Sequence, residues 1–290
     1  MSWYERMNRA MDYIESRLSG NMEFVEIARI MGQSAVNFQR TFSIVTGMSV
    51  FEYIRRRRMT LAAFDLQNGA SKVIDLAIKY AYESPEAFTR AFKEIHGVSP
   101  TMARAQGVAL RSFPRMTFLL TLKGDVAMEY RIENKEEFPV YGIEGIFTTE
   151  EGQNLVDIPA FWTDCFNDGC CEDLLQSTHD PLSRIHAICD YRETGGKTFP
   201  YMLFVHRTPA SEVQGYTCVD VPAATWAVFK SERHTREQTS KVTQDLIKRV
   251  YTDWLPTASY RKIDGYELEM YHICGENDYY VEAWIKVEPN

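Results

Sequence analysis

Apolar residues in the first third of the chain recur at helical spacing. Phe38 and Phe42 lie four positions apart, as do Phe88 and Phe92, so each pair would face a core from one side of a helix. Residues typical of helix boundaries flank these segments. They are Ser49, Ser71, Ser84 and Pro85 at expected helix starts, and Gly47 and Gly97 at expected helix ends.

The helical pattern occurs twice. FQRTFSIVTGMS, which begins at Phe38, matches FTRAFKEIHGVS, which begins at Phe88, fifty positions later. Each copy predicts a short helix, a tight turn and a second helix, which is the helix-turn-helix unit. A helix over about residues 49–66 would join the two units and would be about 27 Å long. That length suits two recognition helices in major grooves that are ~34 Å apart on one face of a duplex.

Side chains that leave the apolar face of each second helix are candidates for DNA contact. Arginine and glutamine form paired hydrogen bonds with guanine and adenine edges, and small apolar groups contact the thymine methyl. Arg56, in a run of four arginines at 55–58, is a candidate for phosphate, although that run could equally be a solvated basic face. The helix candidates are Ala35, Val36, Gln39 and Arg40 in the first unit and Pro85, Glu86, Thr89 and Arg90 in the second.

Two stretches resemble the AraC-type DNA-binding domain. They are GMSVFEYIRRRRM and, about forty residues later, YESPEAFTRAFKEIHGVSP, and the resemblance covers about residues 5–107. It implies an all-α domain that binds double-stranded DNA and regulates transcription. Two positions depart from the family pattern: Ala81 stands where glycine is common in the second turn, and Met102 with Ala103 replaces an aromatic ending.

Beyond a linker expected at residues 108–125, which contains Pro114 and Gly124, strands and helices alternate. Strand-like segments at 126–132 and 140–147 precede a helix at about 158–176 and strands near 184–191 and 201–206. A pair-like run at 216–229, broken by Pro222, then precedes a helix at 235–251 and strands at 266–272 and 279–287. Two β-α-β-β passes predict an α+β domain over 126–290 with a pseudo-twofold cavity.

The last strand, YYVEAWIKV, separates its side chains into two faces. Val281, Ala283, Ile285 and Val287 alternate and predict a core face. Tyr280, Glu282, Trp284 and Lys286 occupy the other face. A carboxylate beside tryptophan there is either solvent-exposed or lines a concave site that favours an organic cation.

Four segments of this second part resemble the GyrI-like effector-binding domain of multidrug-responsive regulators. They are VPAATWAVF from Val221, DWLPTAS from Asp253, YELEMYH from Tyr266 and YYVEAWIKV from Tyr279. The resemblance implies a bulky, lipophilic, often cationic ligand between two halves and a glutamate on the final strand, here Glu282; Lys286 replaces a usual proline. Further aromatic candidates, each of which could instead be core, are Phe161, Trp162, Tyr201, Trp226 and Trp284. Glu269 and Tyr271 form a second acid and phenol pair, which could instead be a solvated edge.

Charge divides the chain in the same place. The 290 residues carry a net charge of −8, which at first sight argues against a nucleic-acid binder. Through Arg115, however, sixteen basic and eleven acidic residues give +5, and the remainder has −13. We therefore expect a mildly basic DNA-binding part and an acidic part; that acidity suits a cation-attracting pocket and equally suits a protein-interaction module, with RNA polymerase as a candidate partner.

Motifs for other chemistry are missing from the sequence. The six cysteines form no CxxC pair, the six histidines have no metal spacing, and no phosphate-binding, dinucleotide or nucleophile motif is present. We expect no metal and no cofactor, and the absence of a secretory signal or an apolar run of 18 residues predicts a cytoplasmic protein outside membranes. An enzymatic alternative, hydrolysis of reactive electrophiles, would rely on Glu282 with Tyr201 or Tyr271.

Overall fold

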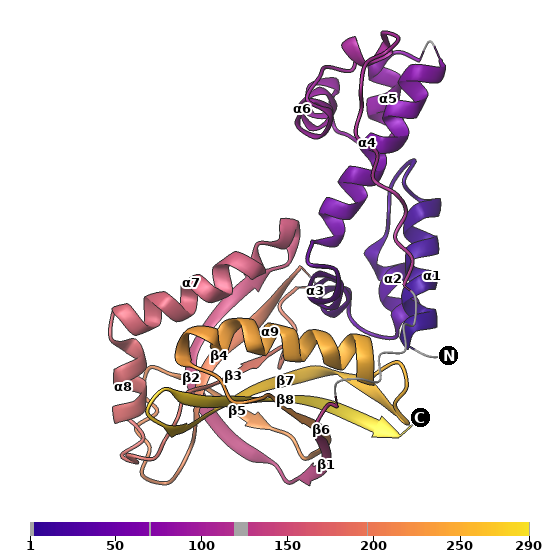
Figure 1. Cartoon of the computed structure of the whole chain (residues 1–290). Helices are drawn as coiled ribbons and strands as arrows, with labels where there is room; N and C mark the ends of the chain where they lie inside the picture. The colour runs from indigo at the N-terminus through magenta and orange to yellow at the C-terminus, as the bar shows by residue number, and fades with distance from the viewer. Residues whose placement is uncertain (1–2, 70, 119–126, 196, 290) are drawn as a thin grey trace.

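The structure is a computed structural model that describes residues 3–69, 71–118, 127–195 and 197–289 (Figure 1). A helical N-terminal part precedes a C-terminal part built on one β-sheet, so the expected order of an all-α and an α+β domain is confirmed. Residues 119–125 of the expected linker and residue 126 of the expected first strand lie outside the described residues. The expected domain boundaries therefore stay predictions.

The N-terminal helices form two helix-turn-helix units joined by a long helix. Serine side chains cap three of these helices: Ser34 accepts a hydrogen bond from the backbone of Asn37, Ser49 from Glu52 and Ser84 from Ala87. Ser71 does not cap, because the extended Lys72 precedes the helix instead. The helices are α1 (Trp3–Ser16), α2 (Phe24–Met31), α3 (Ala35–Thr46), α4 (Val50–Asn68), α5 (Val73–Lys79) and α6 (Pro85–His96), with a 3-10 turn at Met102–Arg104.

The arginine run on α4 holds the N-terminal part together. Arg57 donates hydrogen bonds to Glu15 on α1 at 2.8 and 2.9 Å, and both side chains are largely buried. Arg58 donates to the backbone carbonyls of Leu18 and Gly20, while Arg56 pairs with Glu52. At least part of the run is thus structural. Figure 1 shows α5 and α6 at the end of α4 that is remote from the sheet.

The C-terminal part is a single antiparallel sheet of eight strands in the order β1-β6-β8-β7-β3-β4-β2-β5. When this order is reversed, each of β1 to β4 falls on the strand that comes four later in the chain: β1 on β5, β2 on β6, β3 on β7 and β4 on β8. The expected pseudo-twofold repeat is therefore confirmed, with its axis between β7 and β3. The strand β1, which precedes the first β-α-β-β repeat, pairs with β6 of the second repeat, and β5, which precedes the second, pairs with β2 of the first. The strands are β1 (Tyr130–Lys135), β2 (Phe138–Thr148), β3 (His186–Cys189), β4 (Thr198–His206), β5 (Thr217–Val221), β6 (Ala224–Lys230), β7 (Tyr260–Gly275) and β8 (Asp278–Pro289).

Helices cover one face of this sheet. The single helix expected at 158–176 is two helices, α7 (Asn154–Asn167) and α8 (Cys170–Gln176), because Gly169 adopts φ +87° between them. The second pass contributes α9 (Thr239–Arg249), which continues into a π-helical turn at Val250–Trp254. Leu203 on β4 packs under α7 and α8, and Ala283 on β8 packs under α9. Leu203 pairs in register with Ala187 on β3, which pairs with Glu269 on β7, which pairs with Ala283. Paired residues point to the same side of a sheet, so the three helices cover one face.

The first helix-turn-helix unit and the C-terminal part share one hydrophobic core. Phe38 and Phe42 of α3 belong to the same buried cluster as Phe229 on β6, Tyr251 and Ile285 on β8. The core face expected for β8 is confirmed, since Val281, Ala283, Ile285 and Val287 are all buried. The second unit has a separate core built around Phe88 and Phe92.

Candidate functional site

A carboxylate and three aromatic side chains meet on the helix-covered face of the sheet. Glu269 on β7 accepts a hydrogen bond from the hydroxyl of Tyr271 at 2.6 Å and from that of Tyr201 on β4 at 3.1 Å. Trp162 on α7 donates its indole N–H to the Tyr201 oxygen at 2.9 Å and lies edge-on to the Tyr271 ring. We call these four residues the Glu269 cluster. Three of them were expected in a binding site, and Glu269 was expected only as a secondary acid.

The electrostatics of the Glu269 cluster suit a cation. Burial raises the pKa of Glu269 above its ordinary value, while the hydrogen bonds from Tyr271 and Tyr201 and the charge of Arg40 lower it. A desolvated carboxylate among aromatic side chains attracts an organic cation through its charge, and the aromatic rings add to that attraction through their quadrupoles. Phe161, expected beside Trp162, instead contacts Phe147 at 5.5 Å between ring centroids and extends the apolar surroundings.

Glu282 lies on the opposite face of the sheet. It pairs in register with Met270, which is adjacent to Glu269 on β7 and therefore points the other way. Arg131 donates to both carboxylate oxygens of Glu282 at 2.8 and 3.1 Å, and the Trp284 indole donates at 3.0 Å. Burial raises the pKa of Glu282, but the neighbouring His272 at 3.7 Å and the hydrogen bonds from Arg131 and Trp284 outweigh it and bring the pKa to about 2.

The expected ligand-binding residues thus fall into two groups that cannot line one site. Trp284 contacts Trp226 at 6.1 Å between ring centroids on the Glu282 face, and both rings are buried. The pairing of Glu282 with Tyr201 or Tyr271 for acid and base chemistry is not formed, because the sheet separates them. A protein cation already neutralises Glu282, whereas Glu269 accepts hydrogen bonds from neutral donors.

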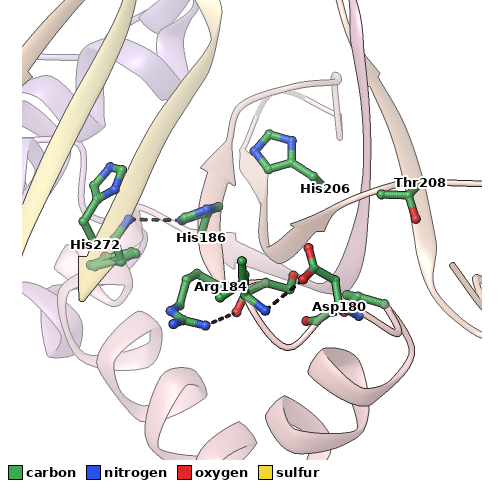
Figure 2. Close-up of a pocket in the computed structure, with 10 residues that line it drawn as sticks. Asp180, Arg184, His186, His206, Thr208 and His272 are labelled. Atoms are coloured by element: carbon green, nitrogen blue, oxygen red, sulfur yellow. Dashed lines mark hydrogen bonds between the residues drawn. The ribbon is translucent and has the colours of Figure 1, made fainter. Parts of the chain in front are cut away.

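A cavity of about 230 Å³ is lined in part by His272 (Figure 2), whose Nε2 is 3.7 Å from an oxygen of Glu282. His186, His206 and His272 line it together with Arg184 and Asp180. The Nδ1 of His186, which Figure 2 labels, accepts a hydrogen bond from the backbone N–H of Tyr271 at 3.1 Å. The guanidinium of Arg184 opposes the charge of Asp180, and burial lowers the pKa of His186 and of His206, so these imidazoles are neutral. This cavity is therefore a poorer cation site than the Glu269 cluster.

The residues expected to contact DNA occupy two different environments. In α6, Glu86 and Arg90 are exposed while Pro85 and Thr89 are half-buried. In α3, Val36, Gln39 and Arg40 are at most 7% exposed, and Ala35 is half-buried, as is Arg56 on α4. The helix equivalent to α6 in the first unit therefore presents its expected DNA-contacting side chains to the sheet.

Arg40 lies in a charged site that the sequence pattern does not predict. Its guanidinium donates to Glu267 at 3.0 Å and to the Cys189 sulfur at 2.9 Å, and it stacks over Phe199 at 4.7 Å. Lys262 also contacts Glu267, at 2.8 Å. Glu267 and Glu269 are two residues apart and share one face of β7, which the sequence YELEMY does indicate.

Metal and membrane features are missing from the described ranges. No group of three or more histidine, cysteine, aspartate or glutamate side chains in residues 3–69, 71–118, 127–195 and 197–289 is arranged to hold a metal ion. Within the same ranges, no helix has the length and apolarity needed to cross a bilayer.

Comparison with known proteins finds separate relatives for the two parts. Residues 131–287 match the family "Integron-associated effector binding protein", and residues 27–106 match a helix-turn-helix domain family. The HTH-type transcriptional activator AarP of Providencia stuartii is 39% identical over 92 residues, which are 32% of this chain and 68% of AarP. The transposon Tn10 TetD protein of Escherichia coli is 37% identical over 92 residues, 32% of this chain and 67% of TetD.

A solved structure also resembles the C-terminal part. The structure of SAV2435 bound to tetraphenylphosphonium aligns with 56% of this chain and 94% of that chain, at 18% identity and a TM-score of 0.44.

Proposed function

The chain belongs to the integron-associated effector binding protein family and is an AraC-type DNA-binding transcriptional regulator, and we propose that a lipophilic organic cation is its effector. The Glu269 cluster carries this proposal. It offers one carboxylate with no cationic side chain hydrogen-bonded to it, enclosed by Trp162, Tyr201 and Tyr271. An aromatic enclosure with a single acid favours a charged centre surrounded by apolar groups over a neutral or an anionic ligand.

Thermal unfolding of the full chain with tetraphenylphosphonium tests the proposal, because a ligand that binds the native state raises the midpoint by mass action. Tetraphenylborate has the same shape and the opposite charge and should give no shift. Glu269→Gln should abolish the shift, whereas the control Glu212→Gln, an exposed carboxylate paired with His179, should keep it. Equal shifts with both ions, or an undiminished shift in Glu269→Gln, would reject the proposed site.

For DNA we propose that the exposed residues of α6, led by Arg90 and Glu86, contact the duplex together with the α3 residues. Arg90 suits a guanine edge or a phosphate, and Glu86 suits a cytosine amino group. We further propose that the protein acts in the cytoplasm and that RNA polymerase is a partner. Footprinting on its own promoter region would test the DNA contacts, since protection over two successive major grooves is expected when both units bind.

Hydrolysis of an electrophile by the C-terminal part is the second candidate function. The Glu269 cluster supports it, since a carboxyl with a raised pKa beside two phenols can transfer protons. Turnover of a cyclopropane-bearing electrophile that is lost in Glu269→Gln would favour an enzyme. Binding without turnover would favour a sensor alone.

A further inference from the structure

Besides the hydrophobic core that it shares with the C-terminal part, the helix α3 makes polar and charged contacts with that part along its length. At its N-terminus, Asp264 accepts hydrogen bonds from the backbone N–H of Ser34 and from the side-chain amide of Asn37. In its middle, the Thr149 hydroxyl donates to the side-chain oxygen of Gln39. Figure 1 shows α3 close to the sheet and α9, while α6 stands well away from both.

The Arg40 contact is the strongest of these. The carboxylate of Glu267 accepts hydrogen bonds from Arg40 at 3.0 Å and from the Tyr251 hydroxyl at 3.0 Å, and Lys262 is 2.8 Å away. Guanidinium and carboxylate side chains are both about nine-tenths buried. A buried, hydrogen-bonded ion pair fixes the position of α3, because separating it leaves uncompensated charge.

Docking on the sheet and reading of DNA require the same side chains. Val36, Gln39 and Arg40 are the residues of the first unit expected to face base edges, and all three are buried against the C-terminal part. A duplex cannot contact them in this arrangement. The second unit has no such obstruction, because Glu86 and Arg90 are exposed.

The docked arginine lies next to the proposed effector site. Glu267 and Glu269 project from the same face of β7, and the charge of Arg40 acts on both carboxylates. A second cation bound at Glu269 would be repelled by Arg40 and would compete with it for these two acids. Coupling of this kind is reciprocal, so a ligand that weakens docking must itself bind more tightly to the undocked protein.

We propose that α3 docked through Arg40 on Glu267 is an intramolecular block on DNA binding by the first unit, and that a lipophilic cation at Glu269 releases it. Before release, the second unit alone can hold DNA. After release, both units bind. The release step rests on the proposed effector, whereas the block itself does not.

Cys189 reports on the block in the unaltered protein. Arg40 donates a hydrogen bond to its sulfur, and the residue is 4% exposed. Adding a mixed-sequence duplex at low salt should pull α3 from the sheet and raise the rate of Cys189 alkylation about tenfold, within the usual range of coupling between sites. Cys165 on α7 is equally buried and should not respond. Unchanged Cys189 labelling together with protection of two successive major grooves on the duplex would overturn the block, since both units would then bind DNA while α3 stays docked. Unchanged labelling with one protected groove would support the block, because the second unit alone would then hold the DNA.

Variants on the sheet side test the block without altering the expected DNA contacts. Glu267→Gln removes the partner of Arg40, and Asp264→Asn weakens the hold on the helix N-terminus while leaving the buried charges in place. Each should raise duplex affinity without a cation, Glu267→Gln by about tenfold and Asp264→Asn by less, and Glu212→Gln should not. If Glu267→Gln fails to fold, Asp264→Asn and the labelling of Cys189 still test whether the docked α3 blocks DNA binding. Unchanged affinity in a folded variant would overturn the block.

The effector step has a separate readout. Tetraphenylphosphonium should raise the duplex affinity of the wild type and have a smaller effect on Glu267→Gln, which is already released. A cation that binds but leaves DNA affinity unchanged overturns the release step while sparing the proposed effector. If tetraphenylphosphonium does not bind, the proposal that the effector is a lipophilic cation is wrong. The labelling of Cys189 with DNA alone still tests the block in that case.

Discussion

Tyr271 donates a 2.6 Å hydrogen bond to Glu269 on the same strand, two residues away. This bond favours the ionised carboxylate and works against the burial that raises the pKa of Glu269. Because a protonated acid no longer attracts a cation, tetraphenylphosphonium affinity should fall on acidification, beginning at a pH above the ordinary value for glutamate.

Tyr271→Phe should move that fall to a higher pH, since the ionised form loses a donor. Calorimetric titrations at several pH values would measure the midpoint. Tyr260→Phe, on the same strand but outside the cluster, should keep the wild-type profile. An unchanged midpoint in Tyr271→Phe would mean that Glu269 does not govern binding.

Ala81 offers a stability prediction from the backbone alone. It adopts φ +56° in the turn of the second unit, whereas glycine occupies the matching turn of the first unit as Gly32, at φ +67°. A left-handed conformation costs an L-residue about 1–2 kcal/mol, part of which glycine loses again through the entropy of the unfolded chain. Ala81→Gly should therefore raise the free energy of unfolding by about 0.5–1 kcal/mol in urea titrations, and Gly32→Ala should lower it.

The local features of the N-terminal part could be predicted from the sequence because they depend on neighbouring residues. Ser49 and Ser84 cap helices as expected, and Gly47 and Gly97 end helices in the left-handed conformation. The repeat of the segment from Phe38 at Phe88 predicts the two helix-turn-helix units. Ser71 does not cap because the helix begins at Val73 with Lys72 as its N-cap, one residue later than expected, a shift that sequence alone rarely resolves.

The sequence predicts which side chains of a strand share a face, but it does not predict which face of the sheet the helices cover. Alternation assigned Glu282 and Trp284 to one face of β8, but which face the helices cover depends on the strand order. Arg131, which neutralises Glu282, comes from a strand 151 residues earlier that pairs across the two repeats. The docking of Arg40 is equally remote, since its partner Glu267 is 227 residues away.

Arg57 tests whether the arginine run is structural. Its pair with Glu15 is largely buried, so Arg57→Ala should lower the free energy of unfolding by about 3 kcal/mol. Arg29→Ala breaks an exposed pair with Glu26 and should cost less than about 0.5 kcal/mol. The salt dependence of DNA binding by folded Arg57→Ala should match that of the wild type. A shallower slope would instead place Arg57 on a phosphate.

Arg90 should affect DNA binding with little effect on stability, because it is exposed on α6. If it neutralises a phosphate, Arg90→Ala should weaken duplex binding and reduce the slope of log affinity against log salt by about 1. Arg17→Ala, which removes an exposed arginine just after α1, serves as the control. Equal losses in the two variants would indicate a general charge effect rather than a contact.

Stability in mild acid should depend on His186. Burial, with the charges of His206, His272 and Arg184, lowers the pKa of His186 to about 3. The unfolded chain binds a proton near pH 6.5, so this histidine stabilises the fold fully above that pH and loses its contribution as the pH falls toward 3. His206, whose pKa is also lowered, adds to the effect.

In His186→Gln, the decrease in unfolding free energy between pH 6.5 and pH 5 should be shallower by about 1.4 kcal/mol per pH unit. This window lies above the titration of ordinary carboxylates, and carboxylates with a raised pKa, such as Glu269, contribute equally to the wild type and to His186→Gln. The difference between the two proteins therefore reports on His186. The control Gln214→Ala, which replaces an exposed neutral side chain, should retain the wild-type slope in urea titrations. A slope that His186→Gln leaves unaltered would mean that His186 is protonated in the native state.

The hydrophobic cluster that runs from α1 and α3 into β6 and β8 also limits how this protein could have been assembled from parts. A sensor that buried its surface independently could be exchanged between regulators at a linker. Here, separating the two parts at the linker would expose Phe229 and Ile285, which are buried in a cluster with residues of α1 and α3. A recombinant that folds must therefore inherit α1 to α3 together with the sheet. The second helix-turn-helix unit, with a core of its own beyond α4, is the part that recombination can replace freely.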